Sequence, residues 1–109
     1  GLLYKNKGLF ELAIKEYLAA FKLNPQSAEV MVNLGAAYSL SGNILQAERC
    51  LLGAVNLDKN SSLAHYNLGT FYWQRKDYAR AKEEFERALS INPGFGEAKI
   101  WRDKIVGPP

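Results

Sequence analysis

Apolar side chains recur along this chain at intervals of three and four residues, the spacing that places them on one face of an α-helix. The pattern is plainest between residues 28 and 59, where two apolar stripes follow each other. They consist of Val30, Leu34, Ala37 and Tyr38, and then of Ile44, Ala47, Leu51, Ala54, Val55 and Leu57. The Ser-Gly-Asn sequence at 41–43 indicates a turn between them, since glycine tolerates positive φ. The segment therefore predicts two helices joined by a short turn.

Prolines and serines mark the ends of these helix pairs. Pro25 and Pro93 each follow an apolar stripe, and proline cannot continue a helix interior. Ser27, Ser61 and Ser62 come just before the next stripe, where a hydroxyl can cap the first backbone N–H groups of a helix. We therefore expect one helix pair to begin after Ser27 and the next to begin at these later serines.

The sequence matches itself when it is shifted by 34 residues. The aligned triplets are Gly1, Gly35 and Gly69; Tyr4, Tyr38 and Tyr72; Ala13, Ala47 and Ala81; Ala20, Ala54 and Ala88; Leu23, Leu57 and Ile91; and Asn24, Asp58 and Asn92. A fixed period of this length indicates stacked copies of one helix pair. Gly35 and Gly69 stand inside predicted helices, where glycine costs about 1 kcal/mol relative to alanine. We expect close approach of the paired helix, at Ala47 and Ala81, to offset that cost.

Composition places the chain among folded proteins, because 48% of its 109 residues are apolar and 23% are charged. The single cysteine, Cys50, excludes an internal disulfide, and the single histidine, His65, excludes a two-histidine metal motif. We interpret both as packing residues and expect no metal and no cofactor. No stretch approaches the roughly 18 unbroken apolar residues of a membrane span, and no secretory-signal pattern is present, so the sequence does not fix the compartment.

The net charge of +3 does not predict a nucleic-acid partner. The basic residues of 75–87 alternate with acidic ones, a mixture that is typical of a solvated helix face. These acidic residues are Asp77, Glu83, Glu84 and Glu86. We interpret the cluster at 83–86 as part of that solvated face rather than as a catalytic acid/base pair. Recognition of RNA by a helical repeat would require a basic stripe with stacking aromatic residues.

Two runs of residues resemble the tetratricopeptide repeat. The first run contains Asn33, Leu34, Gly35, Tyr38, Gly42, Ala47, Leu51 and Ala54, and the second contains Asn67, Leu68, Gly69, Tyr72, Ala81, Phe85, Ala88 and Pro93. Met31 and His65 stand where this family usually has tryptophan, and Lys76 stands where it usually has the turn glycine. The resemblance implies an all-α fold, a right-handed superhelix of about two and a half repeats followed by a C-terminal capping helix.

The expected domain is a single one that extends over 1–106. Its parts are a partial repeat at 1–27, full repeats at 28–61 and 62–95, a capping helix at 96–106, and a tail at 107–109. The partial repeat is expected to hold a short half helix over 2–7 and a second helix over about 9–23. Because so short a half helix is unstable alone, we expect the chain to be a piece of a longer array.

In this family the first helix of each pair lines the concave face, and the resemblance therefore implies a peptide-binding site. We expect its residues to be Asn33, Asn67, Val32, Ala36, Leu40, Tyr66, Thr70, Trp73, Gln74 and Lys5. Asn33 and Asn67 share one repeat position, and an amide can pair with both the N–H and the C=O of an extended peptide. Such an asparagine ladder is similar to that in the repeats of O-linked N-acetylglucosamine transferase.

The sequence therefore predicts a protein-interaction scaffold that binds an extended segment of a partner, and not an enzyme. No serine, cysteine or carboxylate has a plausible base and orienting partner. The clamp by which some family members hold a C-terminal carboxylate is not predicted, because its cationic positions hold residues such as Leu63 and Trp101. Two alternatives remain: self-association through an exposed N-terminal helix face, and a targeting role within a larger enzyme such as a glycosyltransferase.

Overall fold

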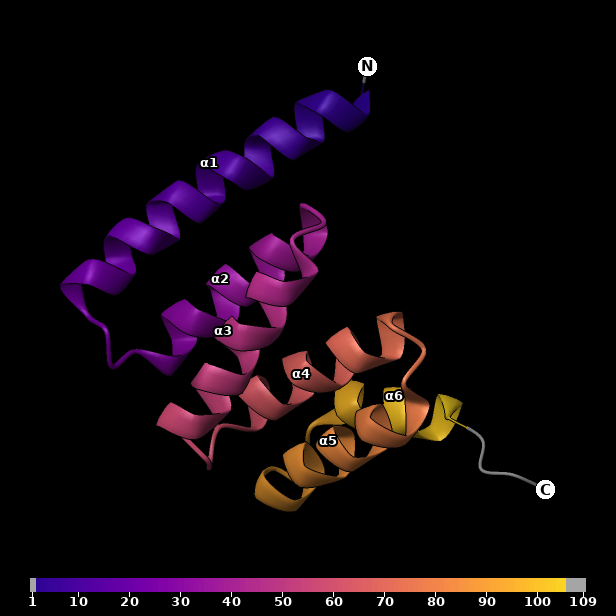
Figure 1. The fold of residues 1–109 in the computed structure, drawn as a ribbon. Helices are drawn as coiled ribbons and strands as arrows, with labels where there is room; N and C mark the ends of the chain where they lie inside the picture. The colour runs from indigo at the N-terminus through magenta and orange to yellow at the C-terminus, as the bar shows by residue number, and fades with distance from the viewer. Residues whose placement is uncertain (1, 106–109) are drawn as a thin grey trace. The chain divides into compact units, whose positions relative to one another are not determined.

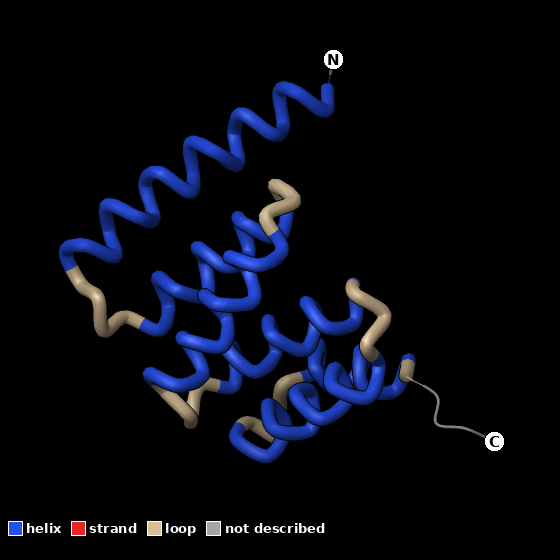
Figure 2. The backbone as a smooth tube through the Cα atoms, viewed as in Figure 1, coloured by secondary structure: helices blue, strands red, loops and turns tan. Residues whose placement is uncertain are grey.

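The computed structural model describes the backbone of residues 2–105 and the side chains of residues 8–105. This part of the chain is all-α, as expected, and holds six helices and no strand (Figures 1 and 2). The helices are α1 (Leu2–Leu23), α2 (Ala28–Leu40), α3 (Ile44–Leu57), α4 (Ser62–Gln74), α5 (Tyr78–Ile91) and α6 (Gly96–Lys104). None of these described helices is both long enough and apolar enough to cross a membrane.

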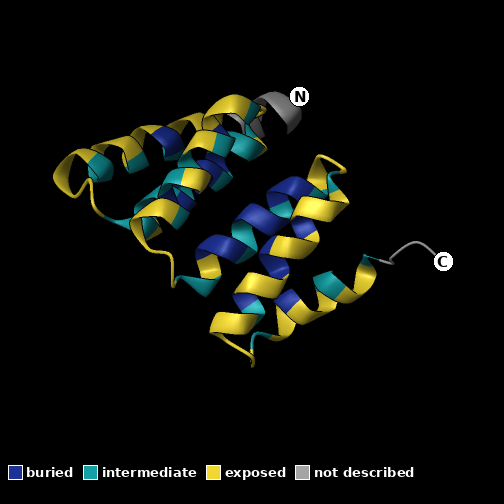
Figure 3. Cartoon of the chain, turned by 60° about the horizontal axis from the view of Figure 1, so that its bottom comes forward, coloured by how far each residue is buried: buried dark blue, intermediate teal, exposed yellow. Residues whose placement is uncertain are grey.

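The chain forms two compact units, residues 1–58 and residues 59–109. The first unit contains α1, α2 and α3, and the second contains α4, α5 and α6. In each unit the helices turn buried faces toward one another and exposed faces outward (Figure 3). Alanines are fully buried in both units, at Ala47, Ala54, Ala64, Ala81, Ala88 and Ala98.

Serine hydroxyls begin the first helix of each pair. The Ser27 hydroxyl accepts a hydrogen bond from the backbone N–H of Val30, and the Ser61 hydroxyl accepts one from that of Ala64, both at 3.1 Å. Each bond satisfies a backbone donor that the helix itself leaves unpaired. Ser62, which the sequence also offered as a cap, is instead the first helical residue of α4.

The turns between the paired helices are alike in both repeats. Gly42 has φ +88° and Lys76, at the same repeat position, has φ +65°. The Asn43 N–H donates to the Tyr38 carbonyl at 2.8 Å, and the Asp77 N–H donates to the Tyr72 carbonyl at 2.9 Å. The repeat at 62–95 therefore keeps the turn although it has Lys76 in place of the glycine. A positive φ in a residue with a side chain carries a conformational cost.

The expected break between a half helix and a second helix near residue 8 is wrong, because α1 continues from Leu2 to Leu23 without interruption. Leu9 occupies the position at which Asp77 begins α5 by accepting a hydrogen bond from the Arg80 N–H. A leucine side chain cannot make that cap, whereas a continuous helix pairs the backbone groups that a break would leave unpaired. Gly8 has open space around it, so no packed neighbour enforces a turn there.

The last helix is shorter than expected, since α6 ends at Lys104. Ile105 already has an extended backbone, with φ −87° and ψ 96°. The remainder of the expected capping helix, Val106, and the tail at 107–109 lie outside the described residues.

The helices of each pair approach closely at the two mid-helix glycines. A Cβ atom added to Gly35 would lie 2.8 Å from Leu51 Cγ, and one added to Gly69 would lie 2.7 Å from Phe85 Cε1. The close approach agrees with the expectation, but Leu51 and Phe85 supply the nearest atoms rather than the alanines. Both large side chains are buried to at least 98%, so each fills the space that its glycine leaves open.

Candidate functional site

Asn33 and Asn67 are both half-buried, on α2 of the first unit and α4 of the second. The Asn67 amide nitrogen donates to the Leu63 carbonyl of its own helix at 2.9 Å. The bond fixes the orientation of the amide and leaves its carbonyl oxygen, together with the second amide hydrogen, for other partners. An asparagine held in this way is suited to reading a peptide backbone.

The other expected peptide-binding residues differ in how far they are exposed. Leu40 is 62% exposed, while Val32 is only 3% exposed and therefore cannot offer a partner much contact area. The Thr70 hydroxyl donates to the Asn67 carbonyl at 2.8 Å. Ala36 is half-buried, Gln74 is exposed at the end of α4, and the Lys5 side chain lies outside the described residues.

Aromatic rings cluster in the second unit. The Trp73 ring on α4 lies 4.7 Å from the Trp101 ring on α6, centroid to centroid, in an edge-to-face arrangement. The Tyr66 ring lies 4.8 Å from that of Phe95 and 6.0 Å from that of Phe85. Burial raises the pKa of the Tyr66 phenol, and the nearby Glu97 charge acts in the same direction. Trp73 and Tyr66 are thus held by packing and are also partly open to solvent.

A cavity of about 270 Å³ lies beside this aromatic cluster. It is lined by Trp73, Tyr78, Lys104 and Ile105, and the Lys104 ammonium lies 4.7 Å from the centre of the Trp101 ring. The sequence analysis did not select Lys104. Extending the 34-residue alignment to α6 would have found it, since Lys104 shares its repeat position with Ala36 and Thr70.

A buried polar group joins α4 and α5. His65 Nδ1 lies 2.8 Å from Glu84 Oε1, and His65 Nε2 lies 3.1 Å from the Lys59 carbonyl oxygen. Arg87 donates to the other Glu84 oxygen at 2.6 Å. His65 and Glu84 are each 5% exposed, so the expectation that residues 83–86 form a solvated face is wrong for Glu84. The described residues contain no group of three His, Cys, Asp or Glu side chains that could hold a metal ion.

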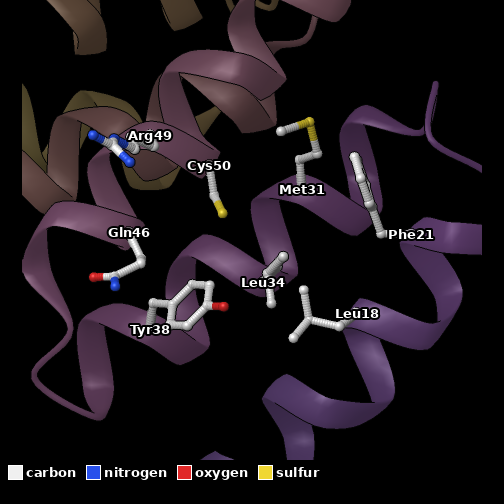
Figure 4. Close-up of a pocket in the computed structure, with 8 residues that line it drawn as sticks. All are labelled: Leu18, Phe21, Met31, Leu34, Tyr38, Gln46, Arg49 and Cys50. Atoms are coloured by element: carbon white, nitrogen blue, oxygen red, sulfur yellow. The ribbon is translucent and has the colours of Figure 1, made fainter.

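A second cavity, of about 220 Å³, lies within the first unit (Figure 4). Its lining comes from three helices: Leu18 and Phe21 of α1; Met31, Leu34 and Tyr38 of α2; and Gln46, Arg49 and Cys50 of α3. The Cys50 sulfur points into this space in Figure 4, and burial raises the pKa of its thiol. The cavity is predominantly apolar, with the polar side chains of Gln46 and Arg49 on one side.

Comparison with known proteins agrees with this architecture. Models of the tetratricopeptide repeat match residues 28–61 and 62–95, and a TPR-repeat model matches residues 1–42. Human tetratricopeptide repeat protein 13 is 33% identical over 107 residues, which cover 94% of this chain and 12% of that protein. The chain also spans only 6% of human superkiller complex protein 3, to which it is 32% identical. It therefore corresponds to a small part of such relatives.

Solved structures show the same fold. The Arabidopsis OM64 TPR domain superposes with a TM-score of 0.82 at 29% identity, covering 94% of this chain and 84% of that one. The first TPR of Spaghetti (RPAP3), solved with the HSP90 peptide SRMEEVD, has a TM-score of 0.81 at 25% identity, covering 94% and 81%. The chain is an all-α repeat protein, and it belongs to the tetratricopeptide repeat family. Domains of this fold are typically non-catalytic modules for protein interaction.

Proposed function

We propose that this chain binds an extended segment of a partner protein along the faces of α2 and α4 that carry Asn33 and Asn67. The observation that carries the proposal is the recurrence of a half-buried asparagine at the same position of both repeats. Peptide binding by related domains supports it, since RPAP3 domains have been solved with HSP90 and HSP70 peptides. We assign no catalytic role to this chain.

Backbone pairing would come from the two amides. Each can donate to a peptide carbonyl and accept from a peptide N–H, which holds the segment extended without reading its side chains. Asn67 is already oriented by its bond to the Leu63 carbonyl, so less rotamer freedom is lost when a peptide binds. Two amides at the same repeat position, one of them already oriented, therefore fit a partner that is recognised first by its extended backbone.

Side-chain selectivity would come from the exposed apolar and aromatic residues near those amides. Leu40 is 62% exposed at the end of α2, and Tyr66 and Trp73 are half-buried on α4. Aromatic side chains with one face packed and one face open give large contact area at low entropic cost. Val32, which we expected to contribute, is too deeply buried for that role.

The test is to capture partners from a source lysate with the wild-type chain and with Asn33→Ala/Asn67→Ala. Each lost hydrogen bond costs about 1 kcal/mol, so loss of at least one bond from each amide should weaken the binding of a purified partner segment by at least roughly thirtyfold. Asn24→Ala/Asn56→Ala is the matched control, since both of these asparagines are exposed and lie outside α2 and α4. Equal capture by all three proteins would remove the asparagine pair from the proposal.

A second candidate function is self-association through α1. Four large apolar side chains among the described residues of this helix are exposed: Leu9 by 58%, Leu12 by 53%, Leu18 by 39% and Leu23 by 89%. Leu9 and Leu12 lie one helical turn apart, and two neighbouring exposed leucines favour association with another apolar surface. Sedimentation equilibrium over a range of concentrations tests it. A Leu9→Ser/Leu12→Ser variant should stay monomeric where the wild type associates, and a wild type that is monomeric throughout removes this alternative.

A further inference from the structure

We propose that the cavity of the second unit receives an apolar side chain of the bound segment, while Lys104 pairs with a carboxylate next to that side chain. The preferred segment would then place aspartate or glutamate beside a leucine, isoleucine or aromatic residue. This inference rests on the proposed function, because it names the chemistry of the segment at one end of the expected binding face.

The cavity has the size and walls for one apolar side chain. Its volume of about 270 Å³ exceeds the ~150 Å³ of an apolar cavity that accepts a benzene ring. Trp73 and Ile105 supply apolar surface, and Tyr78 adds a ring whose centre is 6.2 Å from that of Trp73. Tyr78 is 45% exposed, so the cavity is lined by a side chain that solvent also reaches.

The charge of the site favours an acidic partner. Among residues 8–105, Lys104 makes no ion pair, whereas the neighbouring Asp103 carboxylate already pairs with Arg102 at 3.1 Å. The unit that carries the cavity, residues 59–109, contains nine basic and six acidic residues, while residues 1–58 contain five of each. The entire net charge of +3 therefore belongs to the unit with the cavity.

The position of Lys104 makes its ammonium an effective partner for a carboxylate. The Trp101 ring holds it by a cation–π contact at 4.7 Å, which restricts a side chain that is otherwise flexible. Trp101 is itself fixed against Trp73 and lies 6.2 Å from Phe85, centroid to centroid. A cation that is held in place over an apolar surface loses less freedom on binding than a free lysine does.

Repeat alignment connects this cavity with the expected binding face. Trp101 shares its repeat position with Asn33 and Asn67, and Lys104 shares its position with Thr70. A segment that runs along α4 past Asn67 and Trp73 would therefore meet Lys104 next. The acidic and apolar pair belongs to the part of the segment that lies beyond the asparagine contacts.

Tryptophan fluorescence tests the inference directly, because the chain has only two tryptophans and both belong to this cluster. The probes are three blocked eight-residue peptides that alternate leucine with aspartate, leucine with asparagine, and serine with aspartate. The leucine–aspartate peptide should shift the emission at the lowest concentration, and the leucine–asparagine peptide should bind about tenfold more weakly. Lys104→Met should weaken binding of the leucine–aspartate peptide about tenfold, the effect of losing one charge-assisted contact. Lys99→Met, an exposed lysine on the same helix, is the control and should leave binding unchanged.

A charge reversal sharpens the result. Lys104→Glu should prefer a leucine–lysine peptide, and circular dichroism melting of each variant shows that it folds. Equal binding of the aspartate and asparagine peptides, or equal effects of the Lys104 and Lys99 variants, overturns the inference.

The proposed function is judged separately, from twelve-residue segments selected by display on the intact chain. Selected segments that depend on Asn33 and Asn67 but carry no acidic residue keep the proposed function and overturn this inference. If none of the three probes binds at about 1 mM, the inference also fails, whatever the selection gives.

Discussion

The two repeats share a backbone design and differ in the chemistry between their helices. In the first repeat Met31 and Cys50 both line the apolar cavity of about 220 Å³. At the same positions of the second repeat, His65 and Glu84 are joined at 2.8 Å and are each 5% exposed. The fold thus accepts either sulfur side chains beside a cavity or a hydrogen-bonded polar pair. Both repeats keep the mid-helix glycine of the first helix and the large buried side chain, Leu51 or Phe85, that packs on it.

A third position changes together with these two. A Cβ atom added to Gly53 would lie 2.6 Å from Met31 Cε, so the methionine side chain occupies the space over that glycine. Arg87 stands at the corresponding position of the second repeat and reaches Glu84 at 2.6 Å. Gly53 therefore makes room for the apolar Met31 side chain, whereas Arg87 adds a hydrogen bond to the polar pair. The three positions should be exchanged as a set.

The largest effect is expected when one half of the polar pair is removed. His65→Leu leaves the buried Glu84 carboxylate without its partner on α4 and should lower the free energy of unfolding by about 3 kcal/mol. His65→Met/Glu84→Cys/Arg87→Gly, which installs the first-repeat residues at all three positions, should recover much of that loss, because well-packed apolar residues can replace a buried polar pair. Urea denaturation followed by far-UV circular dichroism measures both.

Met31→Leu is the matched control in the first repeat, where an apolar exchange of similar volume should cost less than about 1.5 kcal/mol. If the single His65 variant is no less stable than this control, the polar pair does not stabilise the second repeat. If the triple variant is as unstable as the single one, packing rather than charge determines the cost.

The glycine contacts are expected to give the next largest effect. Gly69→Ala forces a Cβ atom against three atoms of the rigid Phe85 ring, at 2.7, 2.8 and 3.1 Å, and should destabilise the protein by about 2 kcal/mol. Gly35→Ala places a Cβ atom 2.8 Å from Leu51 Cγ and 3.3 Å from the Ala47 carbonyl oxygen, and should also be destabilising. Gly8→Ala has open space within a continuous helix, so it should stabilise by up to about 1 kcal/mol. Thermal unfolding of the three variants gives the order, and a destabilising Gly8→Ala would contradict the continuous α1.

The sequence predicted the helix pairs because their signals are local. Ser27 and Ser61 cap helices as expected, and the glycines at 35 and 69 lie at close helix contacts. The continuity of α1 was missed because the repeat pattern placed a turn at Gly8, although Leu9 cannot cap a following helix. Gly8 also lacks a packed neighbour that would enforce a turn, so the helix continues where the alignment placed a break.

The polar chemistry was harder to predict, because burial of a charge depends on a partner distant in sequence. Glu84 lies among charged residues that suggested solvent, yet it aligns with Cys50 and pairs with His65, which is 19 residues earlier. Lys104 was not selected because residues 96–106 were not aligned with the first helices of the two repeats. The candidate binding residues themselves stay predictions, since they were inferred from the family resemblance and await a bound partner.

The turns of the two repeats offer a smaller effect with opposite signs. Lys76→Gly should stabilise the chain by up to about 1 kcal/mol, because glycine adopts the observed φ of +65° without steric cost. Gly42→Ala should destabilise by a similar amount, since φ there is +88°. Lys82→Gly, in the interior of α5, is the control for lysine replacement and should be destabilising. If chemical denaturation shows that Lys76→Gly lowers the free energy of unfolding as much as Lys82→Gly does, the turn at Lys76 carries no strain.

The smallest effect concerns Cys50, whose polar counterpart in the second repeat is Glu84. Burial raises the pKa of the Cys50 thiol, so alkylation by iodoacetamide near neutral pH should be slower in the folded chain than in urea. Because the folded-state pKa is the higher one, the contribution to stability is complete below the unfolded pKa and is lost as the pH rises through the folded value. Cys50→Ala should therefore lose less stability than the wild type as the pH rises above about 8.5, the ordinary pKa of a cysteine thiol. Identical pH profiles for the two proteins would mean that the thiol is solvated like a free cysteine, and that the apolar first repeat does not exclude a charge as its structure implies.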